Sequence, residues 1–157
     1  MTATATPINW RFVSFDQLTL QELYSVLQLR SQVFVVEQAC LFQDMDGADD
    51  VAMHLLGTAG GQLAAYARCF SAGVKFAETS IGRVLTRGSL RGSGAGHLLM
   101  RQAIEAVYQH WGPQPIRIGA QSRLEKFYAQ HGFSDTNRPY VEDGIAHIEM
   151  LRPVSMF

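Results

Sequence analysis

The sequence predicts a mixed α/β domain of the α+β type, in which about four helices flank a central, mostly antiparallel sheet of about six or seven strands. Apolar residues at period two indicate strands in both halves of the chain, and apolar residues at helical spacing indicate helices between them. A strand–helix–strand order in the second half implies that part of the sheet is parallel. The length of 157 residues suits one hydrophobic core, and we assign residues 1–157 to a single domain.

The chain begins with a predicted strand and a helical region. Residues 8–13 carry Ile, Trp and Phe at period two, which indicates a half-buried strand. Thr19 and Glu22 have the spacing of a capping box, which marks the start of a helix. Apolar residues then recur at helical spacing over residues 20–35, and this pattern predicts one amphipathic helix or two short ones.

An acid-rich loop and three further strands follow. Residues 38–50 are polar and contain several aspartates, so we expect a loop there. Residues 51–56 and 63–70 are predicted strands joined by a tight glycine turn. Residues 76–85 predict a fourth strand, which we expect to bend at Gly82. These neighbouring strands are joined by short connections and are therefore expected to pair antiparallel.

The second half of the chain alternates strands and helices. A glycine-rich turn at residues 91–96 opens into a helix with a regular apolar face. Residues 116–120 predict a short strand, and residues 122–130 predict a short helix that a glycine terminates. Residues around 140–141 and over 145–151 predict a final hairpin.

Composition and charge exclude several classes of function. The 13 basic and 14 acidic residues give no electrostatic basis for binding nucleic acid or an anionic membrane. No uncharged run approaches the roughly 20 apolar residues that span a bilayer, and the first residues do not resemble a signal peptide, so we expect a cytoplasmic protein. Cys40 and Cys69 lack the spacing of metal ligands, and we expect two buried, reduced thiols and no metal, with a disulfide between them as the alternative.

The glycine-rich turn has the features of an anion-binding site. The first amides of a helix lack intrahelical partners, and the helix dipole adds about half a positive charge there. Glycines let the backbone approach a phosphate closely, and Arg91 adds a fixed charge, so a diphosphate is the expected ligand. An ordinary flexible loop is the alternative. His97 and Leu98 replace the Lys-Ser/Thr pair of a nucleoside triphosphatase, while His97 and Leu99 break the dinucleotide pattern G-x-G-x-x-G.

The turn also fits the pattern R-x-x-G-x-G, and with its flanking strand and helix it resembles the coenzyme A-binding signature of the GNAT superfamily of acyl-CoA N-acyltransferases. Residues 121–133 are similar to the superfamily segment N-x-x-A-x-x-F-Y-x-x-x-G-F, with Gln121 at the usual asparagine and Leu124 at the usual alanine. Further segments over nearly the whole chain resemble the ElaA-like branch, whose acceptor is poorly defined: residues 28–38, 43–46, 65–68, 81–84, 119–121 and 142–144.

This resemblance implies a GNAT-like fold with a splay between the fourth and fifth strands, and acetyl-CoA or another acyl-CoA as co-substrate. It also implies which residues bind coenzyme A. Backbone groups of the fourth strand would hold the pantetheine arm as an added strand, the turn would hold the diphosphate, and Gln121, Phe127 and Tyr128 would lie beside the pantetheine. The full set is Val84, Leu85, Thr86, Arg91, Gly92, Ser93, Gly94, Ala95, Gly96, His97, Gln121, Phe127 and Tyr128. Residues 87–90 replace the usual Asp-Pro, from which we expect a changed turn.

N-acyl transfer from a thioester gives Tyr128 a catalytic role. The neutral amine must lie near the thioester carbonyl, and the oxyanion needs a donor, expected from a backbone N–H at residues 84–85. A phenol with a pKa of about 10 can donate to the departing thiolate, whose conjugate acid has a pKa of about 8.5 by analogy with cysteine. Core packing with a surface hydroxyl is the alternative role for Tyr128.

The general base is left open by the sequence. Glu37 ends the first helical region, and His54 and His147 can take a proton near pH 6.5. For each, a purely structural role is the alternative, and so is deprotonation through water. His147 is expected on the same sheet face as Ile145 and Glu149 because the three alternate.

Charged residues inside apolar segments are candidates for acceptor binding. Arg30, Arg68 and Arg83 must reach water, a carboxylate such as Glu37, Asp44 or Asp46, or an anionic group on the acceptor. The aspartates at 44, 46, 49 and 50 either attract a cationic amine or form a solvated loop. The candidate acceptor set is Arg30, Phe34, His54, Arg68 and His147.

We therefore expect an N-acyltransferase that moves an acetyl or other short acyl group from coenzyme A to a primary amine by direct attack in a ternary complex. The acceptor is a small-molecule amine or a peptide N-terminus, without a nucleic-acid or membrane partner, and a homodimer is retained as an alternative to a monomer. The alternative functions are a non-catalytic acyl-CoA-binding or regulatory module and an enzyme like the acyl-homoserine-lactone synthases, to which the Arg30, Phe34 and Glu37 segment has a loose similarity.

Overall fold

The computed structural model describes residues 7–154 and contains seven strands in one sheet. The strands are β1 (Asn9–Ser14), β2 (Met53–Ala59), β3 (Gln62–Phe70), β4 (Thr79–Thr86), β5 (Ile116–Gln121), β6 (Ser134–Glu142) and β7 (Ile145–Arg152). Their order in the sheet is β1-β2-β3-β4-β5-β7-β6. Only β4 and β5 pair in parallel, and every other neighbouring pair is antiparallel. The predicted mixed, mostly antiparallel sheet is confirmed.

Three α-helices lie in residues 7–154, where the sequence predicted about four: α1 (Leu20–Arg30), α2 (Ala95–Trp111) and α3 (Glu125–Ala129). The predicted capping box is formed at the start of α1, because the Thr19 amide donates to Glu22 at 2.9 Å and the Glu22 amide donates to Thr19 at 3.0 Å. The second part of the predicted helical region is a π-helical turn, η2 (Ser31–Glu37), which continues α1 without a break. The remaining helical segments are short 3₁₀ turns.

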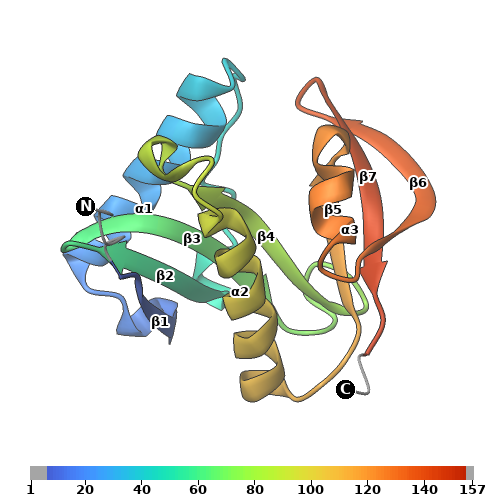
Figure 1. Ribbon diagram of the computed structural model, residues 1–157, viewed down its shortest axis with the longest axis horizontal. Helices are drawn as coiled ribbons and strands as arrows, with labels where there is room; N and C mark the ends of the chain where they lie inside the picture. Colours follow the sequence, from blue (N-terminus) through green and yellow to red (C-terminus); the bar gives the residue numbers. More distant parts are fainter. Residues whose placement is uncertain (1–6, 155–157) are drawn as a thin grey trace, which may run out of the picture.

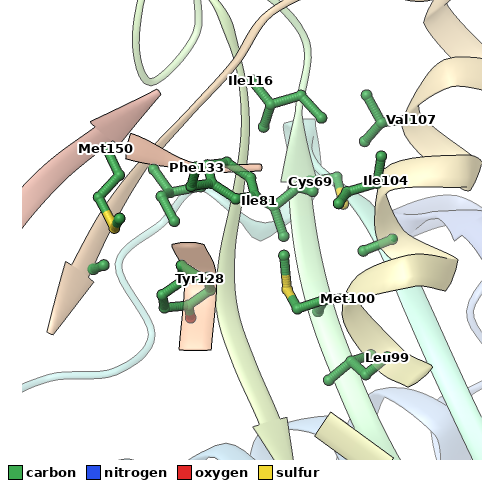
Figure 2. Packing of buried hydrophobic residues seen from close by; sticks show 14 of the residues in the cluster. Cys69, Ile81, Leu99, Met100, Ile104, Val107, Ile116, Tyr128, Phe133 and Met150 are labelled. Carbon is green, nitrogen blue, oxygen red and sulfur yellow. The ribbon is translucent and has the colours of Figure 1, made fainter. Parts of the chain in front are cut away.

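The helices cover opposite faces of the sheet (Figure 1). The main core cluster joins the apolar face of α2 and Tyr128 of α3 to alternate residues of the strands. Figure 2 shows Leu99, Met100 and Val107 of α2 in this cluster, with Ile81 of β4. A second cluster lies on the other face, where α1 and η2 pack on β2, β3 and β4. The period-two alternation of β2 and β3 thus divides each of these two strands between the two cores.

The sheet opens between β4 and β5. These strands pair only at Thr79 with Ile116 and at Ser80 with Arg117, after which they diverge (Figure 1). The expected splay between the fourth and fifth strands is therefore confirmed. A β-bulge adds to it, because Tyr66 pairs with Leu85 whereas Arg68 pairs with Gly82, so β4 carries one extra residue.

The bend in β4 lies at Arg83, one residue beyond the glycine at which the sequence predicted it. Arg83 has a φ of 47°, whereas Gly82 has no positive φ. A left-handed backbone at a residue with a side chain costs about 1–3 kcal/mol and needs support from its surroundings. Asp44 supplies that support, because the Arg83 Nε donates to its carboxylate at 2.9 Å.

Cys40 and Cys69 are both unpaired and buried, as predicted. Burial raises the pKa of the Cys69 thiol to about 12. Among residues 7–154, no helix has the length and apolar character needed to cross a membrane.

Candidate active site

A cavity of about 950 Å³ lies at the splay between β4 and β5. Its walls come from η2, β3, β4, the glycine-rich turn, β5, α3 and β7. It brings together twelve of the residues predicted from sequence: Phe34, Glu37, Arg68, Val84, Leu85, Thr86, Arg91, Gly96, Gln121, Phe127, Tyr128 and His147. The other predicted residues do not line it: Arg30, His54, Gly92, Ser93, Gly94, Ala95 and His97.

The β4 wall of the cavity has an unpaired backbone edge. Beyond Ser80, β4 has no ladder partner on β5, and the bulge at Arg83 turns the strand outward. Val84, Leu85 and Thr86 follow the bulge and line the cavity. Such an edge can accept an extended ligand as an additional strand through main-chain hydrogen bonds.

The glycine-rich turn presents free amides at the start of α2. The amides of Gly94, Ala95 and Gly96 donate no hydrogen bond within residues 7–154, and the first helical bond of α2 is donated by Leu98 to Gly94 at 3.2 Å. The amides of Arg91 and Ser93 are already used, because they donate to Gly88 and Leu90. The Gly92 amide donates no hydrogen bond within the described residues either, so the amides available to an anion are that of Gly92 and those at the start of α2.

Gly94 is the N-cap of α2 and has a φ of 84°, so replacing it with alanine tests the turn directly. A Cβ at Gly94 would contact nothing within 4 Å, so the cost of the change is backbone strain alone. We expect Gly94→Ala to lower the free energy of unfolding by about 1 kcal/mol, measured by urea unfolding. Gly96→Ala is the matched control, since Gly96 has no positive φ and its Cβ would lie in ordinary contact with Phe127. Equal losses in both variants would contradict this account of the turn.

Tyr128 lies between the core and the cavity. The Tyr128 ring belongs to the main core cluster, and Tyr128 as a whole is 8% exposed. Burial raises the pKa of Tyr128 to about 12, so the hydroxyl stays protonated at neutral pH. The hydroxyl has no hydrogen-bond partner within the described part of the chain and is not enclosed by it. A protonated donor facing a cavity can stabilise an anion that forms there.

Phe127 and Gln121 lie beside Tyr128. The Phe127 ring contacts the Tyr128 ring edge-on at 5.1 Å and lies 4.7 Å from the His97 ring. The Gln121 side chain accepts from Arg123 at 3.1 Å and donates to Gln38 at 3.3 Å. Gln121 thus contacts Gln38 at the end of η2 as well as Arg123 in the 3₁₀ turn that follows its own strand.

The segment of residues 37–40, which we call the bridging segment, makes three contacts around the splay, two of which cross it. Glu37 forms an ion pair with Arg91 at 2.5 Å. Gln38 accepts from Gln121, and the Cys40 thiol donates to the Asp143 carbonyl at 3.2 Å. The bridging segment therefore connects the end of η2 with the glycine-rich turn, β5 and the β6–β7 hairpin.

The arginines inside apolar segments bind aspartates of the loop after η2. Arg30 contacts Asp44 at 2.8 Å and Asp49 at 2.6 Å. Arg68 contacts Asp46 at 2.7 Å and Asp49 at 2.9 Å, and Arg83 contacts Asp44. Pairing of these arginines with Asp44 and Asp46 was one of the expected outcomes. The role of Asp49 was not predicted, and Glu37, the third expected partner, pairs with Arg91 instead.

These ion pairs change how the aspartate loop is interpreted. The pKa of Asp46 is lowered because its carboxylate accepts hydrogen bonds from Arg68. Asp44, Asp46 and Asp49 are all paired with arginines. Both interpretations of the loop, as solvated or as free to attract a cationic amine, are therefore wrong for these three aspartates. Arg30 is fully buried behind them and does not reach the cavity.

Arg68 does line the cavity, and its Nε is the buried side-chain polar atom without a partner in residues 7–154. The guanidinium also lies over the Phe70 ring at 4.9 Å. Arg68 is therefore both part of the ion cluster and part of the cavity wall.

The two histidine candidates differ in position. His54 is 1% exposed, and its ring bridges the Tyr66 hydroxyl at 2.6 Å and the Asp49 carbonyl at 2.8 Å. Burial lowers the pKa of His54, which keeps its ring neutral. His54 also lies outside the cavity. His147 lines the cavity, and its Nδ1 donates to the Ile145 carbonyl at 2.7 Å. In that tautomer the His147 Nε2 carries the lone pair and can accept a proton.

Several residues of the cavity were not predicted from sequence. Phe42, Phe70 and Phe76 give the β3–β4 side an aromatic lining, while Arg123 and Tyr140 contribute from the opposite side. Nothing in their spacing distinguished them from core or surface residues. Tyr140 is a partial exception, because it lies in the predicted final hairpin, where it pairs with the candidate His147 and stacks on its ring at 5.1 Å.

A second hollow, of about 1040 Å³, lies along α2 on the side of His131. It includes Gly94, His97 and Arg101 but contains neither the β4 bulge nor Tyr128. His97 contacts His131 at 2.8 Å there, and burial lowers the pKa of His131. The chemistry predicted for an acyl transfer is therefore concentrated in the cavity at the splay.

Comparisons with known proteins agree with this geometry. The family model for an acetyltransferase (GNAT) domain matches residues 18–152. ElaA of Escherichia coli (strain K12) is 41% identical over 149 residues, which cover 94% of this chain and 97% of ElaA. The crystal structure of an acyl-CoA N-acyltransferase from Pseudomonas aeruginosa has a TM-score of 0.86 at 40% identity, covering 92% of this chain and 99% of that one. The acyl-homoserine-lactone synthase LasI has a TM-score of 0.78 at 16% identity, covering 96% and 92% of the two chains, which is a likeness of fold alone.

Proposed function

Because the chain belongs to the GNAT acetyltransferase family, we propose that it moves an acetyl or other short acyl group from coenzyme A to a primary amine. The acceptor in this proposal is a small-molecule amine or a peptide N-terminus. One observation carries the proposal: a single cavity joins the unpaired edge of β4, the start of α2 with its free amides, and the protonated Tyr128. We expect the reaction in the cytoplasm, where thiols such as Cys40 and Cys69 stay reduced.

In this proposal, coenzyme A binds through main-chain groups of β4, which precedes the glycine-rich turn, and of α2, which follows it. The pantetheine arm contains two amides and can pair with the free edge of β4 beyond the bulge. The diphosphate can accept from the amides at the start of α2, with Arg91 beside them. The acyl group then reaches the part of the cavity lined by Phe34, Phe42 and Tyr128.

The transfer itself is a direct displacement in a ternary complex. The lone pair of the neutral amine nitrogen attacks the thioester carbonyl carbon, and the C–N bond forms while the carbonyl oxygen gains negative charge. A backbone N–H after the bulge, near Val84, is the expected donor to that oxyanion. The C–S bond then breaks, the amide nitrogen loses one proton, and the thiolate gains one, so that the products are an amide and free coenzyme A.

Tyr128 donates a hydrogen bond to the departing sulfur in this mechanism. Burial raises the pKa of Tyr128 to about 12, which is above that of a thiol, about 8.5 by analogy with cysteine. Complete proton transfer from the phenol to the thiolate is therefore unfavourable, although the sequence alone allowed it. Tyr128 instead stabilises the thiolate while a proton arrives from solvent or from the base.

The amine proton has two candidate acceptors within the cavity. The His147 Nε2 has a free lone pair, and Glu37 lies at the opposite wall. Deprotonation through water remains the third route. His54 has no part in this proposal because it lies outside the cavity.

Binding and turnover test this proposal separately. Acetyl-CoA at a hundredfold excess over its Kd is expected to stabilise the native state by about 2.7 kcal/mol, which raises the melting temperature. Thiol release is then measured with polyamines, amino acids, aminoglycosides and peptides with free N-termini. Stabilisation without thiol release for any amine would indicate a binding module, and the absence of stabilisation would contradict the proposal.

A further inference from the structure

We propose that Glu37 competes with the diphosphate of coenzyme A for Arg91, so that coenzyme binding frees the Glu37 carboxylate for the acceptor site. This inference rests on the proposed function. It makes Glu37 an antagonist of coenzyme binding as well as a candidate base.

The ion pair itself is the first observation. Arg91 Nη2 lies 2.5 Å from Glu37 Oε1, and both residues line the cavity from different elements. Glu37 ends η2, whereas Arg91 belongs to the turn that precedes α2. Arg91 makes no other ion pair within the part of the chain that the structure describes. The carboxylate therefore occupies a charged donor that lines the same cavity as Gly96 at the start of α2.

The chemistry of the guanidinium allows an exchange of partners. A guanidinium binds a carboxylate or a phosphate through the same N–H groups, and it binds both with similar geometry. The Arg91 side chain is half exposed, and an exposed ion pair of this kind is weak. A diphosphate carries more negative charge than one carboxylate and gains the amides of Gly94, Ala95 and Gly96 in addition. The diphosphate is therefore the stronger partner once it arrives.

The bridging segment can release Glu37 without unfolding. The two other contacts that it makes across the splay are an amide–amide hydrogen bond of 3.3 Å and a thiol–carbonyl hydrogen bond of 3.2 Å. Glu37 and Gln38 belong to neither core cluster. Movement at this segment consequently breaks weak polar contacts and leaves the packing of α1 intact.

The release has a chemical consequence at the acceptor. While Glu37 is held by Arg91, its Oε2 lies 3.5 Å from Gln32 Nε2 and its Oε1 accepts from the guanidinium, which weakens Oε1 as an acceptor for an amine. After the exchange, that oxygen faces the cavity in which the acceptor binds. An amine that enters before the coenzyme therefore meets a carboxylate paired with Arg91, whereas an amine that enters after it meets a released carboxylate.

Calorimetric titration with coenzyme A tests the competition. We expect Glu37→Gln to bind coenzyme A about two- to fivefold more tightly than the wild type, because binding no longer has to break an exposed ion pair. The same variant should lose turnover, which a purely structural role would not combine with tighter binding. Glu142→Gln is the matched control, because Glu142 lines the same cavity and has no ion pair in residues 7–154.

Two further measurements isolate the role of Arg91. In an Arg91→Ala background, Glu37→Gln should no longer tighten binding, and pantetheine, which lacks the diphosphate, should bind wild type and Glu37→Gln alike. Three results would each overturn this inference without affecting the proposed function. They are equal affinities of wild type and Glu37→Gln, an equal gain in affinity in Glu142→Gln, and a gain that persists without Arg91. Failure of the wild type to bind coenzyme A would overturn the proposed function as well.

Discussion

Replacing Arg30 with methionine is expected to lower the free energy of unfolding by about 3–5 kcal/mol, the usual cost of breaking a buried ion pair by removing one partner. The Arg30 side chain is fully buried, and its two aspartate partners are 4% and 14% exposed. Removing it leaves a buried cluster with one excess negative charge. The measurement is urea or thermal unfolding at neutral pH.

Arg11→Met is the matched control for this prediction. Arg11 pairs with Glu22 at 3.1 Å, but the Arg11 side chain is 49% exposed. An exposed pair contributes between about 0 and 1 kcal/mol, so the control should stay close to the wild type. If Arg30→Met loses no more stability than Arg11→Met, the ion cluster does not stabilise the fold as we infer.

Replacing Tyr128 with phenylalanine is expected to lower turnover about a hundredfold, the lower end of the range for removing one hydrogen-bond donor to a charge that develops during the reaction. The ring packing in the core stays the same, so the affinity for coenzyme A should change by less than about twofold. Because burial raises the pKa of Tyr128 to about 12, the hydroxyl is protonated throughout the working range. The ratio of wild-type to variant turnover should therefore stay constant from about pH 6 to 9.

Tyr24→Phe serves as the control for this variant, because Tyr24 is exposed and lies outside the cavity. It should turn over like the wild type. Wild-type turnover in Tyr128→Phe would remove the hydroxyl from the chemistry, while a loss of coenzyme affinity in parallel with turnover would assign it to binding.

The sequence predicted the elements whose signals are local. The period-two runs, the capping box of Thr19 and Glu22, and the glycine-rich turn each depend on a few neighbouring residues, and the structure contains them close to the predicted bounds. The splay could be predicted only through the family resemblance. It depends on where β4 and β5 stop pairing, which no pattern inside either strand specifies.

Long-range pairing explains most of what could not be predicted. Arg30, Arg68 and Arg83 had many possible carboxylate partners, and the choice of Asp49 as a shared partner depends on how the loop folds back over β3. The bend at Arg83 depends on Asp44, 39 positions away in the chain. Glycine was the natural expectation for a bend, but here an ion pair holds a residue with a side chain in the left-handed region.

The aromatic lining of the cavity also had no local signal. Phe42, Phe70 and Phe76 come from a loop, a strand end and a connection, and only the folded arrangement brings them to one wall. Apolar residues at such positions are usually interpreted as core. The sequence consequently predicted the coenzyme side of the cavity better than the acceptor side.

The ion pair between Arg83 and Asp44 makes the reacting centre depend on a distant loop. The backbone donor expected near Val84 follows directly after Arg83, and Asp44 holds that backbone in its unusual conformation. Residues around Asp44 should therefore tolerate few substitutions during evolution, although they touch no reactant. A substitution at Asp44 would impair stability and catalysis together, because the same carboxylate pairs with the buried Arg30 and with Arg83.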